Sequence, residues 1–424
     1  MASQSAPTLE QILSRLDRLE RENAALRDEV RALRQEVRGE QGATLEERVA
    51  ITERRTEEQA QTKVEASQRM PIRITGMALV NAFVNSRQNG GSDNPTIAST
   101  TRGAAIGGGT LRQSMIGFAY EGPATFLGGH VSGSLNLDFF GGTNQPLNLL
   151  PRIRTASVEL DWGRRSLMVG QEKPIFAPRD PTSLAQVGVS PLTGAGNLWL
   201  WSPQIRYEER FSLAEQTQFK AQVGVYQTSE NAAIVPAAFA GSLARYRPGY
   251  QGRFEIAHSL ANGGRIEIAP GFHLSSTHVA ATSVPSRLVS LDWLISPISR
   301  VEFTGTVFTG KNLALFGTGG IRQGFFVNGA GDVDAIRAQG GWAQLKLTAT
   351  DRLSFHLMGG QHDDRNRDLR GTGIGRNQAY GGNFFYRLAP NVIFSLEMLR
   401  LRTQYLGQGN RLNNHYDASV AYLF

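Results

Sequence analysis

The segment from His130 to Phe140 reads His-Val-Ser-Gly-Ser-Leu-Asn-Leu-Asp-Phe-Phe, and its side chains alternate between polar and apolar. The polar set is His130, Ser132, Ser134, Asn136 and Asp138, and the residues between them are small or apolar. Successive side chains of a β-strand point to opposite faces. The segment is therefore predicted to be a strand with one wet face and one apolar face.

The same alternation recurs from residue 72 to the last residue. Clear instances are Phe219–Val225, Ile266–Leu274, Val289–Ile295, Val301–Val307, Val392–Met398 and Tyr416–Phe424. Sixteen such segments are predicted, beginning near residues 72, 111, 127, 152, 165, 197, 216, 248, 265, 284, 300, 337, 352, 377, 392 and 412. An even number of strands fits a closed barrel.

Long and short connections separate these segments. The long ones are Arg87–Thr110, Phe140–Pro151, Pro174–Gly196, Ser229–Arg247, Lys311–Ile336 and Asp363–Arg376, and the short ones include Gly163–Arg164, Ser296–Ser299, Thr350–Asp351 and Ala389–Asn391. Long loops on one rim and short turns on the other are typical of an outer-membrane barrel. The predicted fold is an all-β transmembrane barrel of sixteen antiparallel strands over residues 71–424, preceded by an α-helical coiled coil.

The N-terminal part has a different period. Its heptad positions are Leu9, Ile12, Leu16, Leu19, Asn23, Leu26, Val30, Leu33 and Val37, spaced alternately by three and four residues. That spacing is the signature of a left-handed coiled coil. We expect a flexible stretch over residues 1–8, the coiled coil over 9–39 and a helical linker over 40–70.

The number of helices in the coil is open between two and three. Asn23 at a heptad position with leucines beside it is often a device of dimers. The run Arg15-Leu-Asp-Arg-Leu-Glu20 instead resembles the pattern of short trimeric coiled coils. We favour a homotrimer.

Composition excludes several classes of protein. The 424 residues include no cysteine, so thiol nucleophiles, disulfides and thiolate metal sites are excluded. No run of eighteen apolar residues occurs, which excludes a transmembrane helix. No metal site, cofactor, catalytic set or nucleic-acid motif is predicted: His130 and Ser132 share the polar face of a strand, and His362-Asp-Asp364 lies among arginines.

Charge is distributed unevenly between the two parts. Residues 1–70 hold 12 basic and 14 acidic side chains, which leaves 32 basic and 23 acidic ones for the remaining 354 residues. Because charges avoid a lipid-facing surface, we expect most of this excess of nine in the lumen and loops, where it would concentrate anions.

The strand alternation also predicts which charged residues line the lumen. We expect Arg206, Lys220, Arg253 and Lys346 on inward positions, with Glu208 and Glu255 beside them, so that the lumen holds both signs. The third long loop carries Arg179 and Asp180. Arg179, Arg206 and Arg253 are the candidate constriction residues.

The chain resembles the DcaP-like trimeric porins and the related phosphate-selective porins. The resemblance rests on the order of coiled coil, linker and barrel, on Val169–Pro174 before the third long loop, on Ser202–Tyr207 after it, and on the final Ala-Tyr-Leu-Phe424. It implies a channel in the cell outer membrane for passive diffusion of small, mostly anionic solutes, with the coil in the periplasm. A dense inward ladder of arginines, which the phosphate-selective members have, is missing here, so phosphate specificity is not expected.

Partners follow from the same resemblance and from the basic excess of the barrel. Val420, Tyr422 and Phe424 resemble the signal that the barrel-assembly machinery reads, and loop arginines are expected to meet lipopolysaccharide in the surrounding bilayer. Two other readings stay open. The chain could be a structural tether whose coil binds peptidoglycan or a periplasmic partner, or a trimeric adhesin, although sixteen strands in one chain argue against the adhesin.

Overall fold

The computed structural model describes residue 28 and residues 72–424, except for 127, 143–146, 148, 231–234, 236, 318–320, 322 and 329. The chain divides into two units, Met1–Met70 and Pro71–Phe424. The coiled coil and linker predicted for 9–39 and 40–70 therefore lie outside the described residues, apart from residue 28. In the described part, no helix has the length and apolar character needed to cross a membrane.

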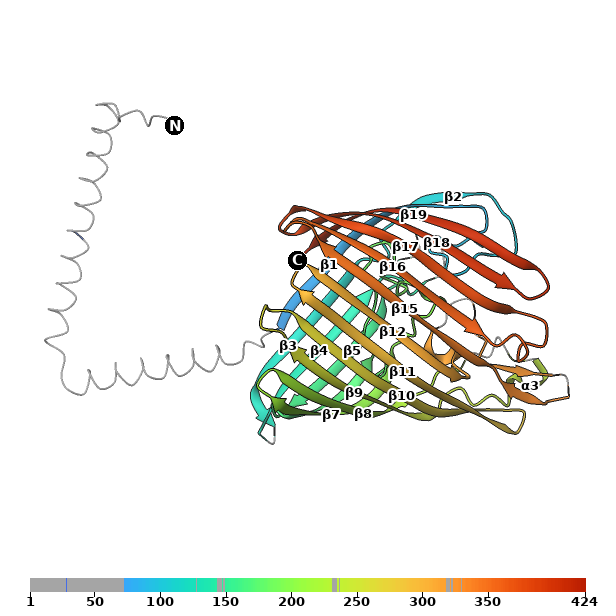
Figure 1. Ribbon diagram of the computed structural model, residues 1–424, viewed down its shortest axis with the longest axis horizontal. Coiled ribbons are helices and arrows are strands. Elements are labelled where there is room, and N and C mark those ends of the chain that lie inside the picture. Colours follow the sequence, from blue (N-terminus) through green and yellow to red (C-terminus); the bar gives the residue numbers. More distant parts are fainter. Residues whose placement is uncertain are drawn as a thin grey trace, which may run out of the picture. The chain divides into compact units, whose positions relative to one another are not determined.

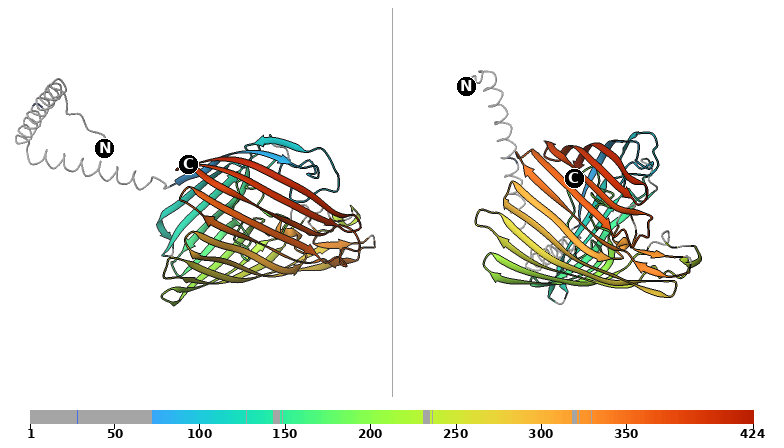
Figure 2. Two further views of the ribbon diagram at one scale, coloured as in Figure 1. Left: turned by 45° about the horizontal axis from the view of Figure 1, so that its top comes forward. Right: turned by 45° about the vertical axis from the view of Figure 1, so that its right-hand side comes forward.

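Sixteen antiparallel strands of the described part form a closed barrel (Figures 1 and 2). They are β1 (Ile72–Asn85), β3 (Met115–Phe126), β4 (Gly129–Asp138), β5 (Arg152–Asp161), β6 (Arg165–Glu172), β7 (Ser202–Ala214), β8 (Thr217–Gln227), β9 (Pro248–Ser259), β10 (Arg265–Val279), β11 (Thr282–Ile298), β12 (Val301–Lys311), β15 (Arg337–Thr348), β16 (Leu353–Asp364), β17 (Ile374–Ala389), β18 (Val392–Tyr405) and β19 (Gly409–Leu423). The barrel closes because β1 pairs with both β3 and β19. The predicted barrel is confirmed, and each predicted strand start lies within five residues of an observed one.

Short elements lie in the connections. β2 (Ile106–Thr110) pairs with the second half of β1 and extends the wall above β3. β13 (Phe325–Val327) pairs with β14 (Val333–Ala335), and α3 (Ala237–Ala240) and the 3₁₀ turn η2 (Ala314–Phe316) are one turn each. None of these five was predicted, because each is too short to carry a period.

Connections at the two ends of the barrel differ in length as predicted, with three exceptions, one of which is the three-residue turn 406–408 between β18 and β19 at the end that otherwise has the long loops. The end that holds Ile72 and Leu423, here the short-turn end, has tight hairpins such as residues 299–300, and the other, the loop end, has the long connections. At the loop end, β10 and β11 are nevertheless joined by only Ala280 and Ala281, whose φ angles of 49° and 61° form a two-residue turn. Asp363 was expected in a loop but belongs to β16, which continues to Asp364.

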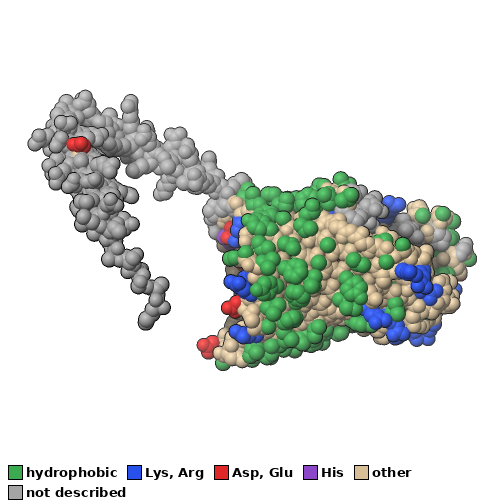
Figure 3. Space-filling model, turned by 90° about the horizontal axis from the view of Figure 1, so that it is seen from above, with side chains coloured by type: hydrophobic (Ala, Val, Ile, Leu, Met, Phe, Trp, Pro, Cys, Tyr) green, Lys and Arg blue, Asp and Glu red, His purple; other side chains and the backbone are tan. Residues whose placement is uncertain are grey.

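The outer surface of the barrel is apolar across its middle. In β1 the outward side chains Ile74 and Val80 are 58% and 50% exposed, whereas the inward Leu79 is fully buried. Figure 3 shows this belt of hydrophobic side chains between two rims that carry charged groups. The alternation of side chains thus gives each strand an apolar outer face, as expected of a barrel whose outside meets lipid.

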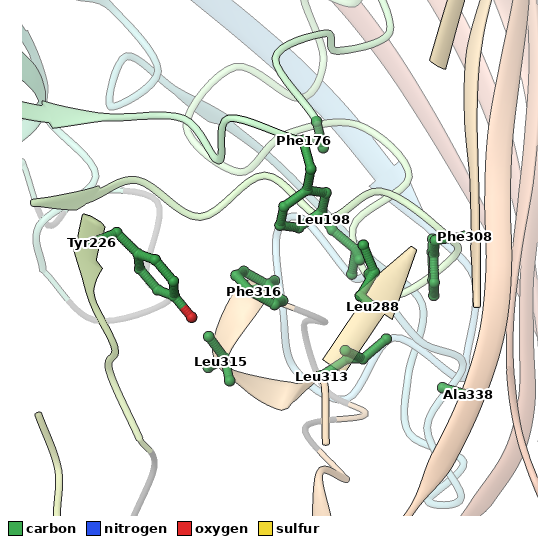
Figure 4. Close-up of a cluster of buried hydrophobic side chains, with 10 residues drawn as sticks. Phe176, Leu198, Tyr226, Leu288, Phe308, Leu313, Leu315, Phe316 and Ala338 are labelled. Carbon is green, nitrogen blue, oxygen red and sulfur yellow. The ribbon is translucent and has the colours of Figure 1, made fainter. Parts of the chain in front are cut away.

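The inside of the barrel is more than a polar lumen. Residues 173–201, here called the inner loop, pack with η2 against the inward faces of β8, β11, β12 and β15 (Figure 4). The cluster comprises Phe176, Ala177, Leu198, Tyr226, Leu288, Phe308, Leu313, Leu315, Phe316 and Ala338. Phe176 and Phe316 meet edge to face with ring centroids 5.0 Å apart. On this side of the barrel the interior is therefore an apolar packed core and not only a polar lumen.

Candidate pore constriction

The inner loop is held to the wall by hydrogen bonds from inward side chains to its backbone. Asn81 Nδ2 of β1 donates to Leu184 O at 2.8 Å, and Asn377 Nδ2 of β17 donates to Gly194 O at 2.9 Å. Gln251 of β9 accepts from Ile175 N at 2.7 Å. Because these three strands lie on different parts of the wall, the loop crosses the interior rather than projecting away from it.

A cluster of ion pairs fixes the first part of the inner loop. Arg179 Nε lies 3.0 Å from Asp292 Oδ1 of β11, and the same guanidinium contacts Glu267 of β10. Arg253 of β9 binds Asp292 at 2.7 Å and Glu255 at 2.7 Å. Buried charges are tolerated only when they are paired and hydrogen-bonded. Arg179 also lies 3.6 Å from Glu255. Strands β9, β10 and β11 therefore each present one inward carboxylate to this arginine of the inner loop.

A second anchor lies across the barrel on β4 and β5. Asp138 binds Arg152 at 2.6 Å and Arg154 at 3.2 Å. Arg154 also donates to Val187 O of the inner loop at 2.6 Å, and Arg152 donates to Gly188 O. The guanidinium groups thus bridge a wall carboxylate and the loop backbone.

A third anchor lacks a basic residue. Ser183 of the inner loop donates to Glu397 of β18 at 2.6 Å, and Asn383 of β17 donates to the same carboxylate at 2.8 Å. Asp417 of β19 accepts from Asn81 at 3.1 Å. This part of the wall therefore uses neutral donors to bind the loop.

Burial of the inward side chains shows where solvent reaches the interior. On β16 to β19 the inward residues are buried beneath the inner loop, including His356, Ser395, Thr403 and Ser419. On β4 to β8 many inward residues remain partly exposed, including Ser132, Asn136, Glu159, Arg206 and Lys220. The solvent-accessible path is therefore lined by the β4–β8 wall on one side and the inner loop on the other.

The structure brings four of the predicted site residues together. Arg179, Arg253 and Glu255 belong to the ion-pair cluster, and Lys220 joins it through a contact of 3.1 Å to Glu255. Arg253 is only 2% exposed and is bound by two carboxylates. It therefore anchors the wall beneath the loop, although its inward direction agrees with the prediction.

The other predicted residues lie apart from this cluster. Asp180 contacts Lys173 and accepts from Ser190 at 2.8 Å, so it braces the inner loop internally. Glu208 pairs with Arg210 at 2.6 Å. Arg206 and Lys346 point inward and are partly exposed, and neither forms an ion pair with another described residue.

Sequence reasoning missed several residues of the constriction. Arg210 could have been found, because it continues the inward alternation of residues 206 and 208. Arg152 and Arg154 could not have been found from the sequence. The β4–β5 pairing has a bulge between Asn136 and Leu137, and this bulge interrupts the alternation of inward and outward side chains beside the two arginines. Lys173 lies in the segment Val169–Pro174 that carries the resemblance, but no role was predicted for it.

The C-terminal residues lie where the prediction puts them. Val420, Tyr422 and Phe424 all point outward, and each is between 42% and 52% exposed. Gly76 N donates to Phe424 O at 2.9 Å, so the last residue closes against β1. Recognition of these three residues by the barrel-assembly machinery stays a prediction.

Comparison with known proteins finds similarity in structure alone. No family model matches the sequence, and no curated protein is similar to it in sequence. The outer membrane channel DcaP of Acinetobacter baumannii shares 15% identity with a TM-score of 0.68, over 83% of this chain and 97% of that one. An anion-selective porin from Comamonas acidovorans shares 12% with a TM-score of 0.56, over 83% and 99%. OmpF of Salmonella typhi, in complex with daunomycin, shares 11% with a TM-score of 0.52, over 83% and 97%. The likeness confirms the porin fold.

Proposed function

We propose that the chain forms a water-filled channel of the cell outer membrane through which small hydrophilic solutes diffuse passively. The single observation that carries this is the one-sided interior, in which inward polar residues of β4–β8 stay exposed to solvent beside a buried inner loop. A closed barrel of sixteen strands is wide enough for an aqueous channel. The structural likeness to DcaP and to other porins supports the same reading.

A preference for anions is the finer part of this proposal. Arg206 and Lys346 place positive charge in the lumen and form no salt bridge with another described residue, while Glu172 lies near Arg206 and Glu302 is the cross-strand partner of Lys346. Residues 71–424 carry nine more basic than acidic side chains, which raises the local concentration of anions. Glu159 and Glu172 also face the lumen, so we expect a moderate preference. One of the structurally similar proteins is an anion-selective porin.

Stoichiometry and partners belong to the proposal as well. We expect a homotrimer whose coil, built on Leu9–Val37, lies in the periplasm. The bilayer with its lipopolysaccharide surrounds the barrel, and the assembly machinery reads Val420, Tyr422 and Phe424. None of these expectations requires a cofactor.

Conductance in planar bilayers tests the proposal. The purified full chain is expected to give stepwise, ohmic channels, and a KCl gradient is expected to give a reversal potential of the sign that marks anion preference. Absence of conductance from correctly folded protein would favour the tether reading instead. A reversal potential of the opposite sign would leave the channel standing and remove the anion preference.

A further inference from the structure

The pairing of the barrel wall is interrupted between β2 and β3. Residues 111–114 stand opposite only residues 78–80 of β1. Strict alternation would send one of two consecutive side chains outward, yet Arg112 and Gln113 are 0% and 3% exposed. The segment is therefore a bulge that turns two neighbouring side chains toward the interior of the barrel.

Two side chains of the bulge fix it in place. The Ser114 hydroxyl accepts from Leu79 N at 2.9 Å and donates to Leu79 O at 3.3 Å, so it takes over both backbone bonds of that residue. Arg112 forms an ion pair of 2.6 Å with Asp93, and its guanidinium carbon lies 3.7 Å from the centre of the Phe140 ring. The bulge is therefore a rigid base for the side chain that lies between these two residues.

That side chain, Gln113, binds three backbone groups of the inner loop. Its Oε1 accepts from Val187 N at 2.7 Å and from Gly188 N at 3.0 Å, and its Nε2 donates to Ala185 O at 2.7 Å. A shift of the loop would leave these buried polar groups without partners, which is costly. Gln113 therefore holds residues 185–188 in one position against the wall.

Val187 and Gly188 in turn hold two arginines through their carbonyl groups. Val187 O accepts from Arg154 at 2.6 Å, and Gly188 O accepts from Arg152. Each of these two loop residues thus has its N–H bound to Gln113 and its carbonyl bound to a guanidinium. The buried amide and the two arginines are therefore linked through the backbone of only two residues.

Arg152 and Arg154 belong to the wall that lines the solvent-accessible path. Their side chains are 29% and 17% exposed, and both bind the buried Asp138. Asp180 lies near Arg154 but is bound to Lys173. Among the ion pairs of the described residues, Asp138 is the one carboxylate that these arginines share. The group therefore keeps an excess of one positive charge beside the path.

A second glutamine binds the inner loop at another place. Gln344 of β15 accepts from Thr182 N at 2.9 Å and donates to Thr182 O at 3.1 Å, and at 2% exposed it is as buried as Gln113. The two glutamines share their burial and their hold on the loop backbone. Of the two, only Gln113 holds residues whose carbonyl groups bind the arginines of the path.

We propose that Gln113 is a positioning residue for ion selection, which sets the direction of Arg152 and Arg154 through the backbone of Val187 and Gly188. Salt screens a charge within about 8 Å at physiological ionic strength, so the position of a lumen charge matters as well as its presence. The inference rests on the proposed channel function and deepens it. It assigns part of the anion preference to a side chain that carries no charge and is buried beside the loop.

Reversal potentials in a KCl gradient test the proposal with Gln113→Met, which fills similar space without the amide. We expect its anion-to-cation permeability ratio to fall by about 1.5- to twofold. Gln344→Met is the matched control, expected to stay within about 1.2-fold of the wild-type ratio. Both variants should lower the temperature at which folded migration on gels is lost. Equal ratios for the two variants would overturn the proposal, because Gln113 would then only stabilise the loop.

A double-mutant cycle tests whether Gln113 acts through the arginines. The background D138N/R152Q/R154Q removes the whole ion-pair group, so that no buried charge is left unpaired. Adding Gln113→Met to this background should change the permeability ratio by less than about 1.2-fold. A change as large as the one it causes in the wild type would overturn the proposal.

A chemical measurement needs no conductance. Phenylglyoxal modifies accessible guanidinium groups, and peptide mass spectrometry gives the rate at Arg152 and Arg154. The rate should rise about twofold or more in Gln113→Met and stay unchanged in Gln344→Met; an unchanged rate in both would overturn the proposal. A raised rate in a protein without conductance would remove the proposed function and leave the positioning role standing. Should Gln113→Met fail to fold, Gln113→Asn, whose amide is one methylene shorter, replaces it with the same expectations.

Discussion

Arg179 of the inner loop and Asp292 of β11 are joined by a contact of 3.0 Å between Nε and Oδ1, deep inside the barrel. The same carboxylate receives Arg253 from the neighbouring wall at 2.7 Å. One buried acid therefore serves both a wall arginine and a loop arginine. Removing Arg179 leaves Asp292 paired with Arg253, so the barrel should persist while the loop loses its fixed position.

We predict that Arg179→Gln loosens the inner loop. The change removes the loop's contacts with Glu267 and Asp292, at a local cost of about 1–3 kcal/mol. Single-channel recordings should then show larger or noisier current levels than the wild type. Lys220→Gln is the matched control, since it removes a cation bound to Glu255 without touching the loop. Equal effects of both variants would mean that lumen charge, rather than loop position, sets the conductance.

Ion selectivity should depend on Arg206. Its charge faces the solvent-accessible side of the lumen with no ion pair among the described residues. We expect Arg206→Ala to lower the anion-to-cation permeability ratio by roughly twofold, because a pore-lining charge sets the local counter-ion concentration. Reversal potentials in a KCl gradient measure the ratio.

Glu159→Gln is the complementary variant, because it removes a negative charge from the lumen where Arg206→Ala removes a positive one. Glu159 faces the same side of the lumen from β5, and its loss should raise the ratio by a similar factor. If both variants shifted the reversal potential in one direction, the charge model would be wrong and a change of pore shape would be the cause.

Much of the barrel could be predicted because a strand has a period of two. Arg206, Lys220 and Lys346 all point inward as the alternation requires. The packing of the inner loop could not be predicted, since it depends on contacts such as Asn81 with Leu184 between residues 103 positions apart. No local pattern encodes such a pairing, so the burial of Arg253 beneath the loop could not be predicted from the sequence.

Arg400 and Arg402 of β18 point outward, in the row of Leu396 and Met398, and this direction was not predicted for another reason. The rule that charges avoid lipid holds for the middle of a span and weakens toward the interface. Without knowing how far β18 extends beyond the belt, Arg400 and Arg402 could be assigned only to a lumen or a loop. Strand length, which a sequence defines poorly, decided their place.

Acid should release the loop of residues 365–373. A hydrogen bond from Arg337 lowers the pKa of Asp368 from its usual 3.8, so the contact stabilises the loop at every pH above that value. The stability that this contact gives the loop is lost as the pH falls through the lowered pKa of Asp368, because the protonated carboxyl no longer attracts the Arg337 guanidinium. Hydrogen exchange of the loop amides, corrected for intrinsic rates, should show faster opening near pH 3 than near pH 6.

Asp368→Asn should remove that pH dependence, so that the loop amides exchange fast both near pH 3 and near pH 6. Asp334→Asn is the control, since Asp334 binds Arg370 of the same loop at an exposed site where an ion pair contributes little. A wild-type loop whose protection does not change with pH would contradict the role assigned to Arg337 and Asp368.

Close approach between the inner loop and the wall makes Gly196 sensitive to substitution. Its φ of +100° is rare for other residues, and a Cβ there would lie 2.1 Å from Gly341 O of β15. Gly196→Ala should therefore cost about 3 kcal/mol or more, through strain and through displacement of the loop from the wall. Gly163→Ala, at φ +80° with no atom within 4 Å of the new Cβ, should cost only about 1 kcal/mol. The temperature at which each variant loses its folded migration on gels measures the difference, and equal temperatures would show that the loop does not depend on this contact.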